Sequence, residues 1–196
     1  MRRAEKKALT VDTVITAAFS LLHDNGYDGT TMDIIAEKAN LARKTLYNIF
    51  SGKDEIILQL LIRLLKENDM QIENVLTQYS TGYDKLFFHL NQYSLFYKEN
   101  SAVYSVQSRY DHIQAIDGVP QMIIDEYKEL KKKSHDRMVR ILEEGIKDGS
   151  LRNDIDCEKV MTIFSASSRA VALESYRSDQ PLYECFLLLF MKSIQG

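Results

Sequence analysis

Polar and basic side chains gather in one short stretch of the sequence, and their types suit hydrogen bonding to a polyanion. The set consists of Arg43, Lys44, Thr45, Tyr47, Asn48 and, a little further on, Lys53. Arginine can donate two parallel hydrogen bonds to guanine and asparagine can pair with adenine, whereas lysine and hydroxyl groups bind phosphate oxygens. Residues four apart share a helix face, which pairs Arg43 with Tyr47 and Lys44 with Asn48. The pattern predicts a helix that presents a polar face suited to the major groove of double-stranded DNA.

The elements around this stretch must hold that face outward. On the other side of the same helix stand Ala42, Leu46 and Phe50, which predicts an apolar anchor. Thr31 is placed to cap a preceding short helix, and Asn40 tolerates the left-handed backbone that a tight turn requires. A helix, a sharp turn and a second helix indicate a helix-turn-helix. Taken singly, the basic residues could equally be ordinary solvated side chains.

Helical periodicity continues along the whole chain. Apolar residues at spacings of three and four predict a first helix that starts after Thr10 as its N-cap and ends at Asn25-Gly26. Later helices are expected at about residues 53–79, 83–99, 121–147, 156–177 and 182–194, with a less regular stretch around Tyr104 and Tyr110. Only 2 Pro and 8 Gly interrupt 196 residues, which favours an all-α protein. We expect two domains, residues 1–52 and 53–196.

The last predicted helix is apolar almost all round, from Phe186 to Phe190. A terminal helix of this kind needs cover on two sides, and a second copy of the chain would supply one of them. A homodimer is therefore expected, with these candidate interface residues: Val160, Phe164, Phe186, Leu187 and Phe190.

Composition and motifs exclude several other classes of protein. The formal net charge is −3, and residues 1–53 hold 8 Lys and Arg against 6 Asp and Glu, so bulk charge alone does not indicate a DNA-binding protein. Cys157 and Cys185 are the only cysteines and form no CxxC pair, so we expect no metal site. No HExxH, GxSxG or phosphate-binding glycine loop is present, and no apolar run could span a bilayer. We expect a cytoplasmic protein that is not an enzyme and needs no cofactor.

Several features at fixed spacing resemble the TetR family of bacterial transcriptional regulators. They are Asn25-Gly26-Tyr27, Thr30-Thr31, Ile35-Ala36, Thr45-Leu46-Tyr47, Phe50 and Lys53, within residues 9–60. The resemblance implies an N-terminal three-helix DNA-binding domain joined by a long helix to a C-terminal helical domain for ligand binding and dimerisation. It also implies that Thr31 and Lys53 contact phosphates and that Arg43, Lys44, Thr45, Tyr47 and Asn48 face the groove. Asn40 stands where the family usually has Gly, and Ala42 where it usually has Ser or Thr.

A pocket for a small-molecule effector is also implied by the resemblance. Aromatic and methionine side chains in the second half of the chain are candidate walls: Phe88, Tyr93, Phe96, Tyr104, Tyr110, Met122, Tyr127 and Phe164. The same residues at helical spacing could instead form ordinary core.

The prediction for function is a homodimeric, ligand-responsive DNA-binding regulator that acts as a repressor. A two-fold dimer predicts a palindromic operator, from which the protein is released when a small molecule binds the C-terminal domain. The alternatives are a DNA-binding regulator without an effector, whose C-terminal domain serves dimerisation or a protein partner, and an all-helical enzyme or scaffold without a DNA role.

Overall fold

The computed structural model describes residues 3–107, 109–111, 114–178 and 180–196. Apart from an isolated bridge between Leu151 and Gln195, these residues hold no β-structure, so the all-α class predicted from the sequence is confirmed. Of the helices in this part of the chain, none is both long and apolar enough to cross a membrane.

The chain forms two compact units, and each of them is made of two separate segments of the sequence. The first contains residues 1–65 and 102–130, and the second contains residues 66–101 and 131–196. Two long helices, α4 (Lys53–Leu76) and α7 (Gln121–Asp148), each contribute residues to both units. This division describes packing, and the functional division between residues 52 and 53 stays a prediction.

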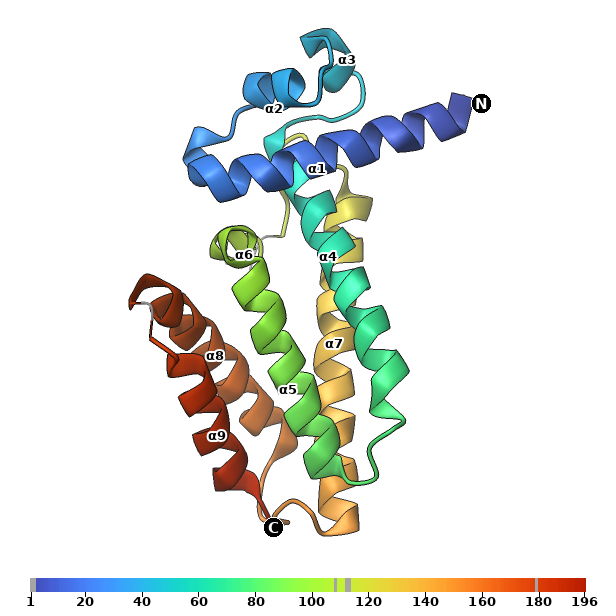
Figure 1. The fold of residues 1–196 in the computed structure, drawn as a ribbon. Helices are drawn as coiled ribbons and strands as arrows, with labels where there is room; N and C mark the ends of the chain where they lie inside the picture. Colours follow the sequence, from blue (N-terminus) through green and yellow to red (C-terminus); the bar gives the residue numbers. More distant parts are fainter. Residues whose placement is uncertain (1–2, 108, 112–113, 179) are drawn as a thin grey trace. The chain divides into compact units, whose positions relative to one another are not determined.

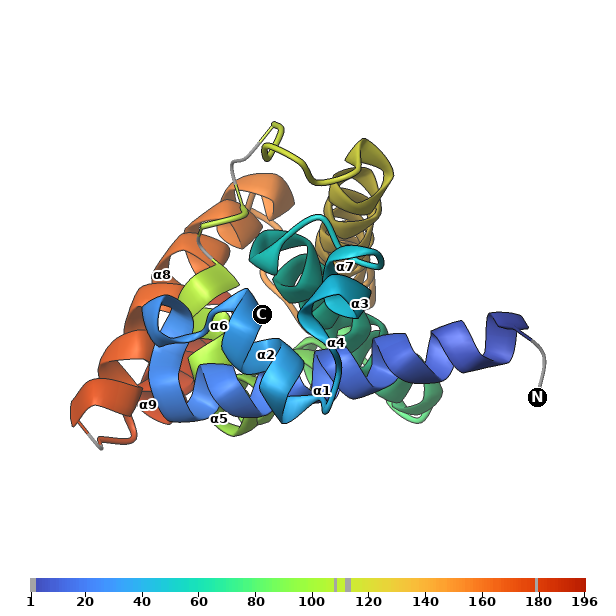
Figure 2. The same cartoon turned by 90° about the horizontal axis from the view of Figure 1, so that it is seen from above.

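In the first unit, three helices and the start of α4 enclose one apolar core. They are α1 (Arg3–Gly29), α2 (Met32–Lys38) and α3 (Arg43–Tyr47), and α2 and α3 lie next to each other on one side of α1 (Figures 1 and 2). The core contains buried side chains from each element: Val14, Ala18 and Leu21 from α1, Ile35 and Ala36 from α2, and Leu46, Phe50 and Ile56 from α3 and beyond. Burial of this apolar stripe is the main term that stabilises helices as short as α2 and α3.

Local signals place most helix ends in this unit. The Thr31 hydroxyl accepts a hydrogen bond from the Ile34 amide, which confirms Thr31 as the N-cap of α2. Gly26 has φ of 67°, so regular helix stops there as expected, and a further turn follows to Gly29. The prediction that Thr10 caps the first helix was wrong: α1 begins at Arg3, and the Thr10 hydroxyl donates to the Lys6 carbonyl inside it.

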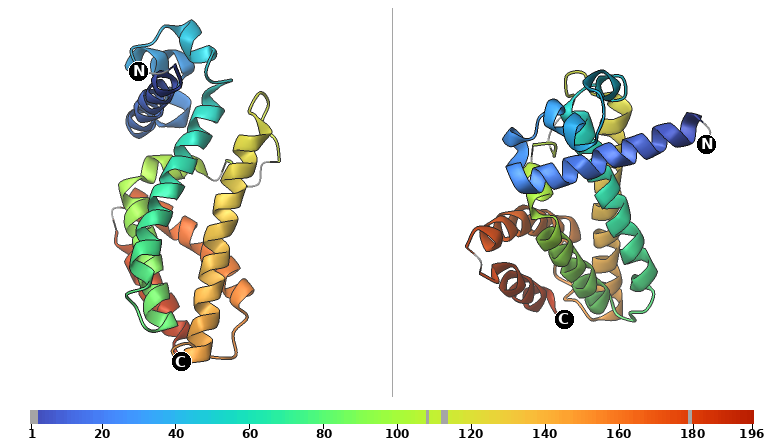
Figure 3. Two further views of the ribbon diagram at one scale, coloured as in Figure 1. Left: turned by 90° about the vertical axis from the view of Figure 1, so that its right-hand side faces the viewer. Right: turned by 45° about the horizontal axis from the view of Figure 1, so that its top comes forward.

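The second unit packs α5 (Gly82–Glu99) against α8 (Cys157–Ser178) and α9 (Leu182–Ile194), which run side by side (Figure 3). Its core includes fully buried residues from α5, α7, α8 and α9: Leu86, Leu90, Leu142, Met161 and Met191. His89 of α5 is also completely buried. The predicted bounds of the last helix agree with those observed.

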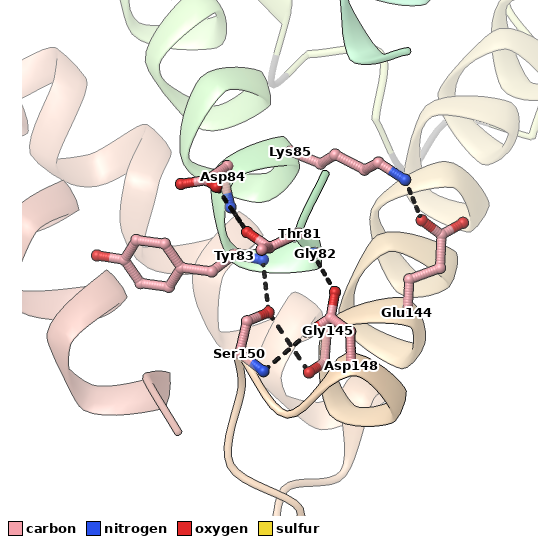
Figure 4. Close-up of polar contacts among 9 residues, drawn as sticks. All are labelled: Thr81, Gly82, Tyr83, Asp84, Lys85, Glu144, Gly145, Asp148 and Ser150. Atoms are coloured by element: carbon pink, nitrogen blue, oxygen red, sulfur yellow. Dashed lines mark hydrogen bonds and ion pairs between the residues drawn. The ribbon is translucent and has the colours of Figure 1, made fainter. Parts of the chain in front are cut away.

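The start of α5 is fixed to the end of α7 by hydrogen bonds (Figure 4). Thr81 and Asp84 form a reciprocal cap, in which the Thr81 hydroxyl both accepts from the Asp84 amide and donates to its carboxylate. The Asp148 carboxylate accepts from the Gly82 and Ser150 amides at 2.7 and 2.9 Å. The Ser150 side chain, together with these two amides, lowers the pKa of Asp148 below its usual value. The two helices can approach this closely because Gly82 and Gly145 meet backbone to backbone.

One helix was not predicted. Residues 101–107 form α6 (Ser101–Gln107) in the stretch that we expected to be less regular. The segment Ser-Ala-Val-Tyr-Ser-Val-Gln is rich in β-branched and hydroxyl side chains, which have low helix propensity. Packing decides here, since Val103 and Val106 are buried.

Candidate nucleic-acid interface

The polar side of α3 faces solvent over a buried anchor. Leu46 is 0% and Phe50 1% exposed, so α3 is fixed to the core by its apolar side. The residues predicted to meet DNA are exposed on the other side: Arg43, Lys44, Thr45, Tyr47 and Asn48. Thr31, at the start of α2, is exposed as well. The orientation agrees with the expected helix-turn-helix, and the roles of individual residues at DNA stay predictions.

The turn between α2 and α3 depends on Asn40. Its φ is 53°, and Leu41 then donates to the Ala36 carbonyl at 2.9 Å, which closes the turn. Ala42 occupies the N-cap of α3 without a side-chain hydrogen bond. Both observations agree with the sequence, in which asparagine replaces the usual glycine and alanine the usual hydroxyl residue.

We expect Asn40→Ala to lower the free energy of unfolding by about 1 kcal/mol, because a Cβ atom disfavours the left-handed region and alanine has no polar group to bond the nearby backbone. Asn40→Gly should not lower it, since glycine adopts this region freely. Urea unfolding at neutral pH measures both. Equal destabilisation by the two variants would mean that the asparagine side chain, and not its backbone conformation, matters at this turn.

Arg43 forms an ion pair with Asp33 of α2 through its Nε atom. The Arg43 side chain is 67% exposed, and exposed pairs of this kind contribute at most about 1 kcal/mol. The pair therefore restrains the guanidinium group without hiding it. The guanidinium group, which can make paired contacts to guanine, thus stays accessible to solvent while it is held by Asp33.

Lys53 is less free than the sequence suggests. Its Nζ donates to the Tyr27 carbonyl at 2.8 Å and lies 3.7 Å from the centroid of the Tyr27 ring. Partial burial lowers the pKa of Lys53, an effect that Asp54 and Asp28 oppose. Its predicted contact with a phosphate would have to coexist with these bonds, so we regard Lys53 first as a group that holds the start of α4 to the end of α1.

A second group of side chains, which the sequence did not predict to meet, lies beside Lys53. One oxygen of the Asp54 carboxylate accepts hydrogen bonds from the hydroxyls of Tyr27 and Tyr110, each at 2.7 Å. We call these three residues the tyrosine–aspartate junction. It connects the end of α1, the start of α4 and the segment after α6. Tyr27 belongs to the Asn-Gly-Tyr motif, but no local pattern indicates that residue 110 would meet it.

The helix-turn-helix is similar in sequence to that of known proteins. Residues 14–60 match the family described as bacterial regulatory proteins of the tetR family. The matched stretch contains α2, the turn, α3 and the start of α4, and so includes the exposed polar face. The N-terminal part of the chain, residues 14–60, therefore belongs to the TetR family. The chain is accordingly similar to transcriptional regulators of that family.

Similarity to individual TetR-family proteins extends over most of the chain. The HTH-type transcriptional repressor KstR2 of Mycolicibacterium smegmatis is 25% identical over 173 residues, which are 87% of this chain and 81% of the relative. The structure of the regulator FadR from Bacillus subtilis in complex with stearoyl-CoA has a TM-score of 0.75 at 19% identity, over 93% of this chain and 98% of FadR. The ketosteroid regulator KstR2 of Mycobacterium tuberculosis also scores 0.75, at 18% identity over 95% of each chain. At these identities the two structures show a shared fold.

The residues predicted to line an effector pocket have different surroundings. Met122 is 75% exposed, so the expectation that it forms part of an enclosed wall was wrong. Tyr110 and Tyr127 are buried in the first unit, and Phe164 is buried in the second. Phe88 is partly buried against Tyr79, with ring centroids 5.1 Å apart. Three predicted side chains lie outside the described part of the structure: Tyr93, Phe96 and Tyr104.

The predicted dimerisation residues of this chain lie mostly inside one copy. Phe164 and Leu187 are each 3% exposed, while Val160, Phe186 and Phe190 are partly buried against the same core. The Phe164 ring packs against those of Phe186 and Phe190 at centroid distances of 5.6 and 4.7 Å, which joins α8 to α9. The outer faces of these helices instead expose three large apolar side chains: Ile163, Leu188 and Leu189, each more than 60% exposed.

Proposed function

We propose that the protein is a homodimeric repressor that binds a palindromic operator through α2 and α3 and leaves it when a small molecule binds. The observation that carries the DNA-binding part is the exposed polar face of α3 over the buried Leu46 and Phe50. A short helix anchored on one side, with arginine, lysine and asparagine on the other, suits insertion into the major groove. Arg43 and Asn48 would contact base edges, while Thr31 would contact the phosphate backbone.

Dimerisation is supported by the outer faces of α8 and α9. The side chains of Ile163, Leu188 and Leu189 are exposed to solvent in a single copy of the chain. Exposed large apolar side chains on two neighbouring helices suit a protein interface. We assign the contact between copies to these three residues, together with the partly buried Val160, Phe186 and Phe190. A two-fold axis through this interface gives two reading faces and hence a palindromic site.

The proposal for the effector follows the relatives. The FadR structure contains stearoyl-CoA, and KstR2 is named a ketosteroid regulator, so both names point to large molecules with an extended apolar part. We extend this class to the present chain, with the second half of the chain as the binding region. To change operator occupancy from nearly full to nearly empty, the effector must prefer the released conformation by roughly 5 kcal/mol.

The test begins with duplexes selected by the purified protein from a random-sequence library. We expect a palindromic sequence, bound with an affinity that falls as the salt concentration rises. Arg43→Ala should weaken binding to the selected duplex about tenfold to a hundredfold and relax the base preference at one position of each half-site. Binding to an unrelated duplex should change far less.

The matched control is Arg140→Ala, which removes the same charge from an exposed position on α7. It should leave the affinity for the selected duplex unchanged. If Arg43→Ala binds the selected duplex as tightly as the parent, the polar face of α3 is not the reading face. Stearoyl-CoA and a ketosteroid are then added separately to the protein–DNA complex. If neither releases the protein from the duplex, the result supports the alternative of a regulator without an effector of this class.

A further inference from the structure

The tyrosine–aspartate junction contains none of the residues proposed above to contact DNA. Tyr110 is only 3% exposed, yet its hydroxyl is directed to the Asp54 carboxylate, which is already bonded to the hydroxyl of Tyr27. One carboxylate oxygen of Asp54 thus binds a hydroxyl 27 positions before it and another 56 positions after it in the sequence. A buried hydroxyl with a charged acceptor is a strong and directional contact.

Two cationic side chains also contact the ring of Tyr27, which is part of the junction. The Lys53 ammonium is 3.7 Å and the Arg109 guanidinium carbon 4.2 Å from the ring centroid. Arg109 also lies 4.0 Å from the Asp28 carboxylate. Tyrosine rings attract cations through their faces, so both neighbours of the junction, residues 53 and 109, add to the same connection.

The hydroxyls of the junction keep their protons under ordinary conditions. Burial, together with the hydrogen bond to Asp54, raises the pKa of Tyr27 and that of Tyr110 above the usual value. Both side chains therefore remain donors to Asp54 throughout the neutral pH range. Loss of a tyrosine proton therefore does not break the junction near neutral pH.

We propose that Tyr27, Asp54 and Tyr110 are positioning residues for DNA binding. By fixing the end of α1 and the start of α4 to the segment that precedes α7, they give the reading face of α3 a single orientation with respect to that segment. None of the three touches DNA in this proposal. The inference rests on the proposed function, because a single orientation matters only if two copies must read one duplex together.

The physical consequence concerns the second half-site. When a dimer has bound one half-site, the second reading face acts at a high effective concentration only if its position is fixed near the other half-site. Loosening the junction spreads the second face over many orientations and lowers that concentration. Binding to an isolated half-site uses one reading face and does not depend on it.

The experiment compares Tyr110→Phe with the parent on two duplexes: the palindrome selected by the parent protein and a duplex that carries one half-site. Phenylalanine keeps the buried ring and removes the hydroxyl that donates to Asp54. We expect the affinity for the palindrome to fall about tenfold or more, the size expected for one lost charge-assisted hydrogen bond. The affinity for the half-site should stay within about twofold.

Tyr127→Phe is the matched control, because it also removes a hydroxyl bond from a buried tyrosine of the first unit. The Tyr127 hydroxyl donates to Asp111 at 3.1 Å and takes no part in the junction. If Tyr127→Phe weakens palindrome binding as much as Tyr110→Phe, general loosening explains the loss and the proposal is overturned. Equal losses on both duplexes for Tyr110→Phe would also overturn it.

A mutant cycle tests whether Tyr110 acts through Asp54. In the Asp54→Ala background, Tyr110→Phe should cause no further loss on the palindrome, because its acceptor is already gone. A full additional loss would contradict the junction as the cause. These outcomes differ from failure of the proposed function, in which the parent protein itself would select no palindrome or bind it no better than a half-site.

Discussion

Gly82→Ala is expected to lower the free energy of unfolding by about 3 kcal/mol or more, as the upper range of overpacking costs indicates. A Cβ atom added at Gly82 would lie 2.2 Å from the Gly145 nitrogen, 2.3 Å from the Gly145 Cα and 2.8 Å from the Ile141 carbonyl oxygen. All three are backbone atoms of α7, so no side chain can move aside. The start of α5 would have to separate from α7 and weaken its hydrogen bond with Asp148 (Figure 4).

Two other glycines provide the comparison. At Gly145 an added Cβ would meet Leu151, whose side-chain atoms at 2.5 and 2.6 Å can shift, so Gly145→Ala should cost less than Gly82→Ala. At Gly52 nothing lies within 4 Å, and Gly52→Ala should have almost no effect on stability. Urea unfolding of the three variants at neutral pH measures the order. A cost at Gly82 no larger than that at Gly52 would contradict the close approach of the two helices.

His89 is expected to make the protein sensitive to mild acid. Burial lowers its pKa from the usual 6.5 to about 4. Between these values the unfolded chain binds a proton at this position and the folded chain does not, so acidification favours unfolding. The contribution to stability is complete above pH 6.5 and is lost as the pH falls towards 4. Over that range it amounts to about 3 kcal/mol, at 1.36 kcal/mol for each pH unit between the two pKa values.

The measurement is the free energy of unfolding in urea at pH 7, 5.5 and 4.5 for the parent and for His89→Leu. The variant should lose much less stability across this range, whatever its stability at pH 7. His23→Gln changes an exposed histidine of α1, so it serves as the control and should retain the acid sensitivity of the parent. If His89→Leu and the parent lose the same free energy on acidification, His89 is not the group that titrates.

The sequence by itself determined the elements and the orientation of the reading helix. The spacing of apolar residues predicted the helices and the burial of Leu46 and Phe50, because a helix that packs on one side must repeat its apolar residues every three or four positions. The cap at Thr31 and the left-handed turn at Asn40 also followed from residue type. These properties depend on residues within a few positions of one another, so they can be predicted from the sequence alone.

Tertiary structure decided which of these residues are free to act. Only packing shows that Met122 is exposed, that Phe164 and Leu187 are used inside one copy, and that α6 forms. The junction of Tyr27, Asp54 and Tyr110, like the contact of Gly82 with Gly145, joins positions more than 50 residues apart. Such pairs leave no periodic signal, because their meeting depends on how helices pack and not on the local sequence of either helix.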